Sequence, residues 1–307
     1  MKKFKLVGVI VVVAAVLAAC SGTGSDNGKA DTTKNKYTYA VITHGAPGDA
    51  FWDRVKSGAE QAGKDYGVKV EYSSDADPAK QSQLIDGAVA DKVDGIVVSM
   101  ANPDGLEASV KKAVAAGVPV ITINSGVDQF KAFGAITHIG QSETIAGEAV
   151  GERLKTMGQK NVICVIQEAG NVGLEQRCAA VAAKLGGKTT NLQVDGTDDN
   201  AVQSTITSKL QADKSIDTVL TLGGQYAIDA VAAVKDSGSS AKVATFDLSE
   251  DVTKDILSGS IVFAVDQQPY VQGFLGVTGL YLKSINGNDI TTATQSGGLS
   301  ALINMRD

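Results

Sequence analysis

Apolar positions along the chain alternate between short continuous runs and longer stretches with helical spacing. Residues 39–43 form a short apolar run, which is typical of a buried strand. The stretch from 55 to 66 then places apolar and small residues three or four positions apart, which predicts a helix with one buried face. Gly67 predicts the end of that helix, and residues 68–72 read as the next strand.

This strand and helix unit recurs through the rest of the chain. A helix is predicted at 143–157, and helices alternate with a series of predicted strands. Those strands lie at 39–43, 68–72, 95–98, 118–123, 135–139, 162–166, 192–194, 218–222, 242–246 and 261–265. Such alternation implies parallel strands joined by right-handed helical crossovers. The two similar halves predict an α/β fold with two doubly wound, Rossmann-like lobes, and a ligand site at the carboxyl ends of the strands.

The beginning of the chain has the pattern of an export signal. Three lysines lie within residues 1–5, and an apolar run follows at 6–17, which is short for a permanent membrane span of about 20 residues. Leu-Ala-Ala-Cys, ending at Cys20, resembles the lipobox of bacterial lipoproteins. We expect residues 1–19 to be removed and Cys20 to carry lipid; a signal peptide followed by a chance cysteine is the alternative. The polar composition of residues 20–36 predicts a flexible tether to the outer surface of the cell membrane.

Charge and composition exclude several classes of function. The chain has 28 Lys and Arg against 34 Asp and Glu, and the leader holds three of the lysines, so a nucleic-acid partner is not expected. His44 and His138 are the only histidines, so no cysteine and histidine cluster for a metal or cofactor is present. The sequence contains no P-loop and no dinucleotide fingerprint after the first strand, and an enzyme is not predicted.

Two cysteines remain after Cys20. Cys164 lies at the end of a predicted strand and Cys178 in the helix that follows it. In an oxidising compartment such residues form a disulfide. Two separate buried thiols are the alternative, and the sequence does not decide between them.

Four segments form a further pattern through their order and spacing. They are residues 48–52 with the following helix, 117–124, 170–177, and 245–247 together with 266–269. From about residue 37 to its end, the chain resembles the type 1 periplasmic binding proteins that serve sugar ABC transporters, and in particular the ribose-binding group.

The resemblance implies that the chain crosses three times between its lobes. The hinges are then expected near 139–141, 267–269 and 294–297. One lobe would comprise residues 37–139 and 268–295, and the other residues 140–267 and 296–307.

Sugar chemistry identifies the candidate binding residues in the first lobe. A sugar has weakly apolar faces and a rim of hydroxyls, so its receptor needs aromatic surfaces and hydrogen-bonding groups. Phe51 and Trp52 follow the first strand, where the ribose-binding group has aromatic residues that enclose the ring; alternatively, one of them packs beneath the helix. Asp49 is a candidate acceptor for sugar hydroxyls or a helix cap. Asn124 follows the fourth strand.

Candidates in the second lobe are Arg177, Asp247 and Gln267. The resemblance places Arg177 in the cleft, Asp247 on a sugar hydroxyl, and Gln267 both at a hinge and in the cleft. A solvated arginine and a carboxylate that starts a turn are the structural alternatives. His44, Ser125 and Asn171 are candidates of second rank.

The chain also departs from the ribose-binding pattern. It has Asn124 and Ser125 where that group has an Asp-Arg pair, and Gly223 and Gly224 where that group has an asparagine. Ribose is therefore in doubt, and the site has more room.

The sequence thus predicts an extracytoplasmic solute-binding lipoprotein that captures a monosaccharide or polyol and delivers it to an ABC permease in the membrane. A receptor of the same fold for a furanosyl signal of the autoinducer-2 kind, or for a nucleoside, is the runner-up. A transcription repressor of related fold would need a DNA-reading helix-turn-helix where this chain has an export signal.

Overall fold

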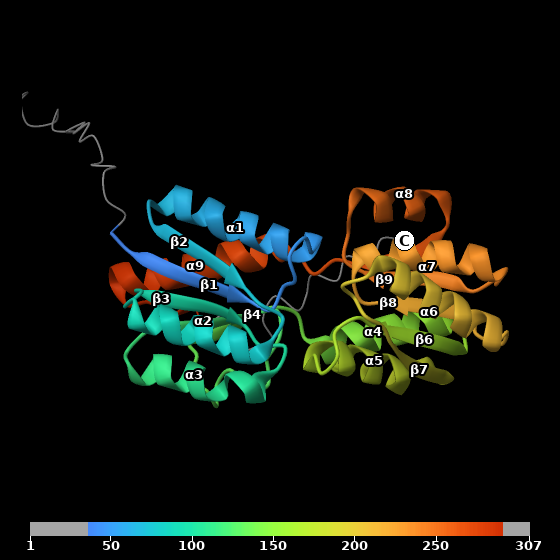
Figure 1. The fold of residues 1–307 in the computed structure, drawn as a ribbon, viewed down its shortest axis with the longest axis horizontal. Coiled ribbons are helices and arrows are strands. Elements are labelled where there is room, and N and C mark those ends of the chain that lie inside the picture. Colours follow the sequence, from blue (N-terminus) through green and yellow to red (C-terminus); the bar gives the residue numbers. More distant parts are fainter. Residues whose placement is uncertain (1–35, 291–307) are drawn as a thin grey trace, which may run out of the picture. The chain divides into compact units, whose positions relative to one another are not determined.

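The computed structural model describes residues 36–290 and contains two five-stranded parallel sheets within that range (Figure 1). Each of the ten predicted strands has a counterpart in these sheets. The prediction of two doubly wound α/β lobes is therefore confirmed.

The first sheet has the strand order β2-β1-β3-β4-β5. Its strands are β1 (Thr38–Thr43), β2 (Lys69–Ser74), β3 (Gly95–Ser99), β4 (Val120–Ile123) and β5 (Thr137–Ile139). Its helices are α1 (Ala50–Tyr66), α2 (Pro78–Ala90), α3 (Pro103–Ala115) and α9 (Pro269–Asn286).

The second sheet has the order β7-β6-β8-β9-β10, which repeats the order of the first. Its strands are β6 (Asn161–Ile166), β7 (Lys188–Gln193), β8 (Thr218–Thr221), β9 (Lys242–Phe246) and β10 (Ile261–Val265). Its helices are α4 (Glu143–Thr156), α5 (Val172–Leu185), α6 (Asp199–Ala212), α7 (Gly224–Ser237) and α8 (Glu250–Ser258). In both sheets the winding direction reverses beside the first strand, between β1 and β3 and between β6 and β8, and ligands bind at such switch points.

Helices cover both faces of each sheet because alternate strand residues point to opposite sides. In β1, Tyr39 and Val41 pack with α1 and α9, whereas Ala40 and Ile42 pack with α2 and α3 (Figure 1). The same alternation in β6 separates α4 and α5 from α6 and α7. The apolar runs of the sequence are thus buried on both sides, as in other parallel sheets.

A disulfide joins strand β6, which lies next to the edge strand β7, to helix α5. Cys164 and Cys178 are bonded, with their Cα atoms 5.8 Å apart, so the structure decides for the disulfide over two separate thiols. Cys178 directly follows Arg177 in the sequence. The bond therefore fixes α5 to its sheet next to the arginine that the sequence singled out.

The described chain passes twice from one sheet to the other, after β5 and after β10. Helix α9, which follows the second passage, packs against β3, β4 and α1 of the first lobe. The third predicted hinge at 294–297, the predicted segment 296–307, the leader, Cys20 and most of the tether lie outside the described residues. Among residues 36–290, no helix combines the length and the hydropathy that a membrane crossing requires.

Candidate functional site

One cavity lies at the carboxyl ends of the strands and is lined by loops of both lobes. The residues that directly follow the switch-point strands take part, with His44 after β1 and Gln167 after β6. Nine of the residues predicted from the sequence line the cavity: His44, Asp49, Phe51, Trp52, Asn124, Asn171, Arg177, Asp247 and Gln267. Ser125 does not line it.

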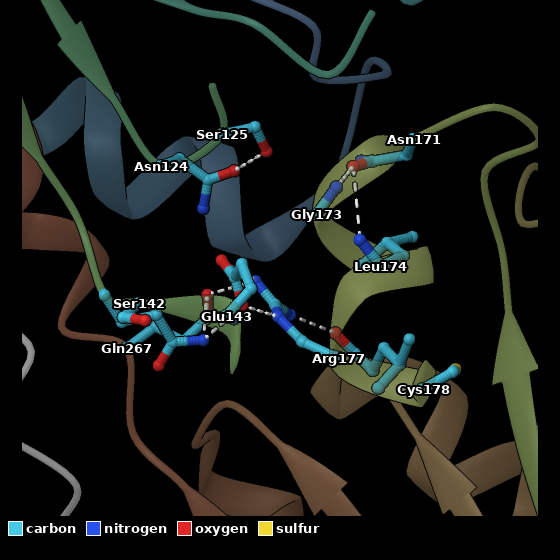
Figure 2. A network of polar contacts seen from close by, with 12 residues as sticks. Asn124, Ser125, Ser142, Glu143, Asn171, Gly173, Leu174, Arg177, Cys178 and Gln267 are labelled. Carbon is cyan, nitrogen blue, oxygen red and sulfur yellow. Dashed lines mark hydrogen bonds and ion pairs between the residues drawn. The ribbon is translucent and has the colours of Figure 1, made fainter. Parts of the chain in front are cut away.

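Arg177 forms the centre of a buried polar network (Figure 2). Its side chain is 3% exposed, and Nε and Nη2 donate to the two carboxylate oxygens of Glu143, with Nη2 2.9 Å from Oε1. Nη2 also donates to Oε1 of Gln267 at 2.6 Å, and the guanidinium carbon lies 4.8 Å from the ring centre of Phe246. Burial opposes the charge of Arg177, but the Glu143 carboxylate, together with Asp247 and Glu168, raises the pKa of Arg177. The guanidinium is charged and fixed. Within the described part of the chain, Nη1 donates a single hydrogen bond, to the Leu222 carbonyl at 3.5 Å.

Glu143 was not predicted as a site residue. It is the first residue of α4, is 2% exposed, and shares the buried stripe of that helix with Ala146, Gly147 and Val150. A carboxylate on an apolar helix face needs a partner. The position of Glu143 on the predicted buried face of this helix was therefore the feature of the sequence that could have identified it.

The network around Arg177 reaches both passages between the sheets. Gln141 lies on the first passage and donates from Nε2 to Oε2 of Glu143 at 2.9 Å and to Oε1 of Gln267 at 3.3 Å. Gln267 lies on the second passage. The two segments are therefore hydrogen-bonded to each other and to the same ion pair.

Asp247 follows β9 and faces the cavity with a constrained carboxylate. Its Oδ1 accepts from Nε2 of Gln267 at 2.8 Å, and the residue is 9% exposed. Burial raises the pKa of Asp247 to about 7, against the opposing effects of Arg177 and the Gln267 hydrogen bond. The backbone has a positive φ of 70°, which is uncommon for residues other than glycine.

Asn124 occupies the matching position after β4, with a φ of 60°. Its Oδ1 accepts from the Ser125 hydroxyl at 2.9 Å (Figure 2). This bond directs the amide Nδ2 away from Ser125, and the described residues offer Nδ2 no hydrogen bond. Ser125, expected as a second-rank ligand residue, thus contacts Asn124 and lies behind the cavity lining.

Asp49 caps α1 and lines the cavity at the same time. Its Oδ1 accepts from the backbone N–H of Phe51 at 2.8 Å. Burial and the nearby Glu168 carboxylate raise the pKa of Asp49 to about 6, against the cap hydrogen bonds. The two interpretations of Asp49, as cap and as acceptor, are compatible because each uses a different oxygen.

The two aromatic residues differ in exposure. Trp52 is 5% exposed and packs in the core of the first lobe, and its ring meets Phe51 edge-on at 5.0 Å between ring centres. Phe51 is only partly buried. Phe51 is therefore the more accessible of the two rings that line the cavity, and Trp52 packs against it.

His44 contacts Ser99 through both its backbone N–H and its ring. The Ser99 hydroxyl oxygen accepts from the His44 backbone N–H at 3.0 Å and lies 2.7 Å from Nδ1. If the hydroxyl donates to Nδ1, the ring proton is on Nε2, which lies 3.7 Å from Oε2 of Glu168. Burial, with a smaller effect of Arg177, lowers the pKa of His44 to about 3. The ring is therefore neutral, and its contact with Glu168 is not an ion pair.

Glu168 was also missed from the sequence. It lies in the loop after β6, lines the cavity, and accepts from Nδ2 of Asn171 at 2.6 Å. Burial raises its pKa, although Asn171 and Arg177 act in the opposite direction. Asn171 itself caps α5 through Oδ1, which accepts from the Gly173 backbone at 3.0 Å (Figure 2).

Comparison with known proteins agrees with this architecture. Residues 39–287 match the family profile described as a periplasmic binding protein domain. A carbohydrate transporter from Acidothermus cellulolyticus 11B, solved in complex with myo-inositol, is 47% identical, with a TM-score of 0.82 over 83% of this chain and 89% of its own.

Two curated relatives are more distant. The D-apiose import binding protein of Actinobacillus succinogenes is 29% identical over 84% of this chain and 82% of its own length. The fructose import binding protein of Bifidobacterium longum is 25% identical over 88% of this chain and 86% of its own length. The chain belongs to the type 1 periplasmic binding protein family and is a binding protein rather than an enzyme.

Proposed function

We propose that this chain is the extracytoplasmic solute-binding component of an ABC transporter and that it captures a neutral monosaccharide or cyclic polyol in the cavity. The observation that carries the proposal is the buried network of Arg177, Glu143, Gln267 and Asp247 beside the partly exposed ring of Phe51. Hydroxyl groups both donate and accept, so they match a site that holds carboxylates, amides and a guanidinium together.

The relatives support this class of ligand. The solved relative at 47% identity carries myo-inositol, a cyclic polyol, and the two curated relatives are named for fructose and D-apiose. All three compounds place hydroxyls on neighbouring carbons. In this chain, the Asp247 Oδ2 atom and the Arg177 Nη1 atom are the groups that we propose for such a pair.

Ligand binding is expected to stabilise the closed arrangement of the lobes. The backbone N–H of Val172 donates to the carbonyl of Ala101 at 3.0 Å, and Gln176 donates to Asp128 at 2.8 Å. These contacts join the two lobes directly. A ligand that touches both lobes adds differential contacts and shifts the population towards this form, which a permease then recognises.

We further propose that the mature chain is anchored by lipid at Cys20. The leader and its ending carry this proposal, and the Cys164–Cys178 disulfide fits an oxidising compartment. Metabolic labelling with a fatty acid tests it: the wild-type chain should incorporate label and Cys20→Ser should not. Equal labelling of both would contradict the anchor.

A thermal-shift screen tests the ligand class. The mature chain with Cys20→Ser is mixed with pentoses, hexoses, cyclic polyols, nucleosides and furanosyl signals. A ligand at about 100 times its dissociation constant stabilises by about 2.7 kcal/mol, a shift of several degrees. Hits among neutral sugars or polyols support the proposal. Hits confined to nucleosides or furanosyl signals, or silence in a cooperatively melting protein, would refute it.

A further inference from the structure

The charged groups that line the cavity are unbalanced. Three carboxylates, those of Asp49, Glu168 and Asp247, line it together with Arg177. The charge of Arg177 is already matched by Glu143, whose two oxygens it binds. Arg177 also attracts Asp247 and Glu168, but within residues 36–290 none of the three carboxylates forms an ion pair with a lysine or an arginine.

The remaining charged residues of the lining are exposed. Arg54 of α1 and Glu250 of α8 are both exposed, and Glu250 lies 2.8 Å from Lys254. Exposed charges of opposite sign are screened by water and salt. They do not offset the carboxylates deeper in the cavity. His44 and Tyr226 also line it, and both are neutral, because burial lowers the pKa of His44 and raises the pKa of Tyr226.

The hydrogen bonds of these carboxylates leave acceptor atoms unused. Each bond recorded above uses one oxygen of the carboxylate: the Phe51 N–H binds Asp49, Asn171 binds Glu168 and Gln267 binds Asp247. The second oxygens of Glu168 and Asp247 accept nothing from the described residues, and Asp49 accepts no hydrogen bond beyond the cap of α1.

Two amide groups of the lining are also incompletely bonded. Oε1 of Gln167 is buried and has no partner within the described part of the chain. Asn124 is 7% exposed, and its Nδ2 is similarly unused. Together with the three carboxylates, Gln167 therefore offers acceptors to which a ligand can donate hydrogen bonds.

The carboxylates also affect one another across the cavity. The negative charge of Glu168 in the second lobe raises the pKa of Asp49 in the first, and that of Asp49 raises the pKa of Asp247, in each case after the larger effect of burial. A positive group between the lobes would remove this repulsion. A negative group would increase it.

We propose that the cavity binds a ligand with an ammonium group, an amino sugar or an aminocyclitol, more tightly than the matching neutral compound, and that it rejects sugar acids and sugar phosphates. An ammonium group brings three donors and a positive charge, which the unused oxygens of Asp49, Glu168 and Asp247 accept. The inference deepens the proposed function and rests on it. Glu168 is the specificity-determining residue, because it faces Asp49 from the opposite lobe.

Calorimetric titration with matched pairs tests the proposal at about pH 7 with the mature Cys20→Ser chain. The probes are scyllo-inositol with its 1-amino-1-deoxy derivative, and D-glucose with D-glucosamine, beside D-glucuronate and D-glucose 6-phosphate. The six hydroxyls of scyllo-inositol are equivalent, so one amine samples every position. We expect the amine to bind about tenfold tighter or more, as for hydrogen bonds to charged groups. Both anions should fail to bind.

Variants assign the effect to the carboxylates. Glu168→Gln should reduce the ratio of amine to neutral affinity severalfold, with a smaller change for the neutral compound. The control is Glu148→Gln, which changes a partly exposed carboxylate of α4 that does not line the cavity and should keep the ratio.

The outcomes separate the two proposals. A neutral compound that binds as tightly as its amine overturns the inference and leaves the proposed function standing. A ratio unchanged in Glu168→Gln, Asp49→Asn and Asp247→Asn also overturns it. If neither pair binds and the neutral screen is silent, the proposed function fails, and the inference fails with it.

Discussion

The ion pair between Glu143 and Arg177 gives the sharpest stability prediction. Their side chains are 2% and 3% exposed, so Arg177→Met leaves a buried carboxylate without its cation. Breaking a buried pair in this way destabilises by about 3–5 kcal/mol. Glu143→Gln should have a smaller effect than Arg177→Met, because the charges of Asp247 and Glu168 still favour the charged arginine.

The double variant Glu143→Gln/Arg177→Met removes both charges together. Replacing a buried pair with neutral groups is often nearly neutral for stability, so the double variant should be more stable than the sum of the single effects by about 2 kcal/mol. For a chain of this size, 1 kcal/mol corresponds to about 2–4 °C in Tm. Arg177→Met should therefore lower Tm by about 10 °C in ligand-free calorimetry and circular dichroism.

A second ion pair between the same two helices is the control. Glu148 of α4 and Lys184 of α5 lie 3.7 Å apart and are about 40% exposed. Exposed pairs contribute about 0–1 kcal/mol, so Glu148→Gln should hardly change Tm. If Glu143→Gln were as mild as Glu148→Gln, or if the double variant equalled the sum of the singles, the argument from burial would be refuted.

Three further predictions concern pH, helix packing and fluorescence. The pKa of Asp247 is raised from 3.8 to about 7 in the folded chain, so its stabilising contribution is complete below about pH 4 and is lost as pH rises through 7. Urea unfolding should show a loss of up to about 4 kcal/mol in the wild-type chain that Asp247→Asn lacks. The same dependence of unfolding free energy on pH in both proteins would contradict this. A Cβ on Gly147 would lie 2.5 Å from the Arg177 carbonyl oxygen, so Gly147→Ala should destabilise by about 1–3 kcal/mol, whereas Gly87→Ala, with open space around it, should not; similar melting of both would count against this close packing. Trp52 is the only tryptophan and lines the cavity, so a ligand found in the thermal screen should change its emission, and an unchanged spectrum at saturation would place that ligand elsewhere.

The strands could be predicted because their apolar runs are buried on both faces. The boundaries differ where local chemistry intervenes. The predicted strand at 118–123 begins at Val120, because Pro119 has no N–H for the ladder, although its carbonyl still accepts from Ile96 at 2.9 Å. The predicted strand at 192–194 is observed as Lys188–Gln193, an edge strand. Its polar residues gave little hydrophobic signal.

The candidate site was harder to predict where the role of a residue depends on how deeply its side chain is buried and on its interaction partner. Residues that follow strands or cap helices, such as Asp49 and Asp247, could be located from the order of elements alone. Glu143 and Glu168 could not be assigned in this way. Glu143 pairs with a residue 34 positions away, and Glu168 matters through its position opposite Asp49. Both effects need the tertiary structure.

The two lobes build the cavity from equivalent positions of one scaffold. Asn124 and Asp247 follow the fourth strand of their sheets, and both have a positive φ. Asp49 and Asn171 cap the helix that follows the first strand of each sheet. In each pair one lobe supplies a carboxylate and the other an amide. The carboxylate at the helix cap, Asp49, belongs to the first lobe, and the carboxylate after the fourth strand, Asp247, belongs to the second. A ligand that uses both carboxylates must contact both lobes, which is the condition under which binding shifts the population towards the closed form.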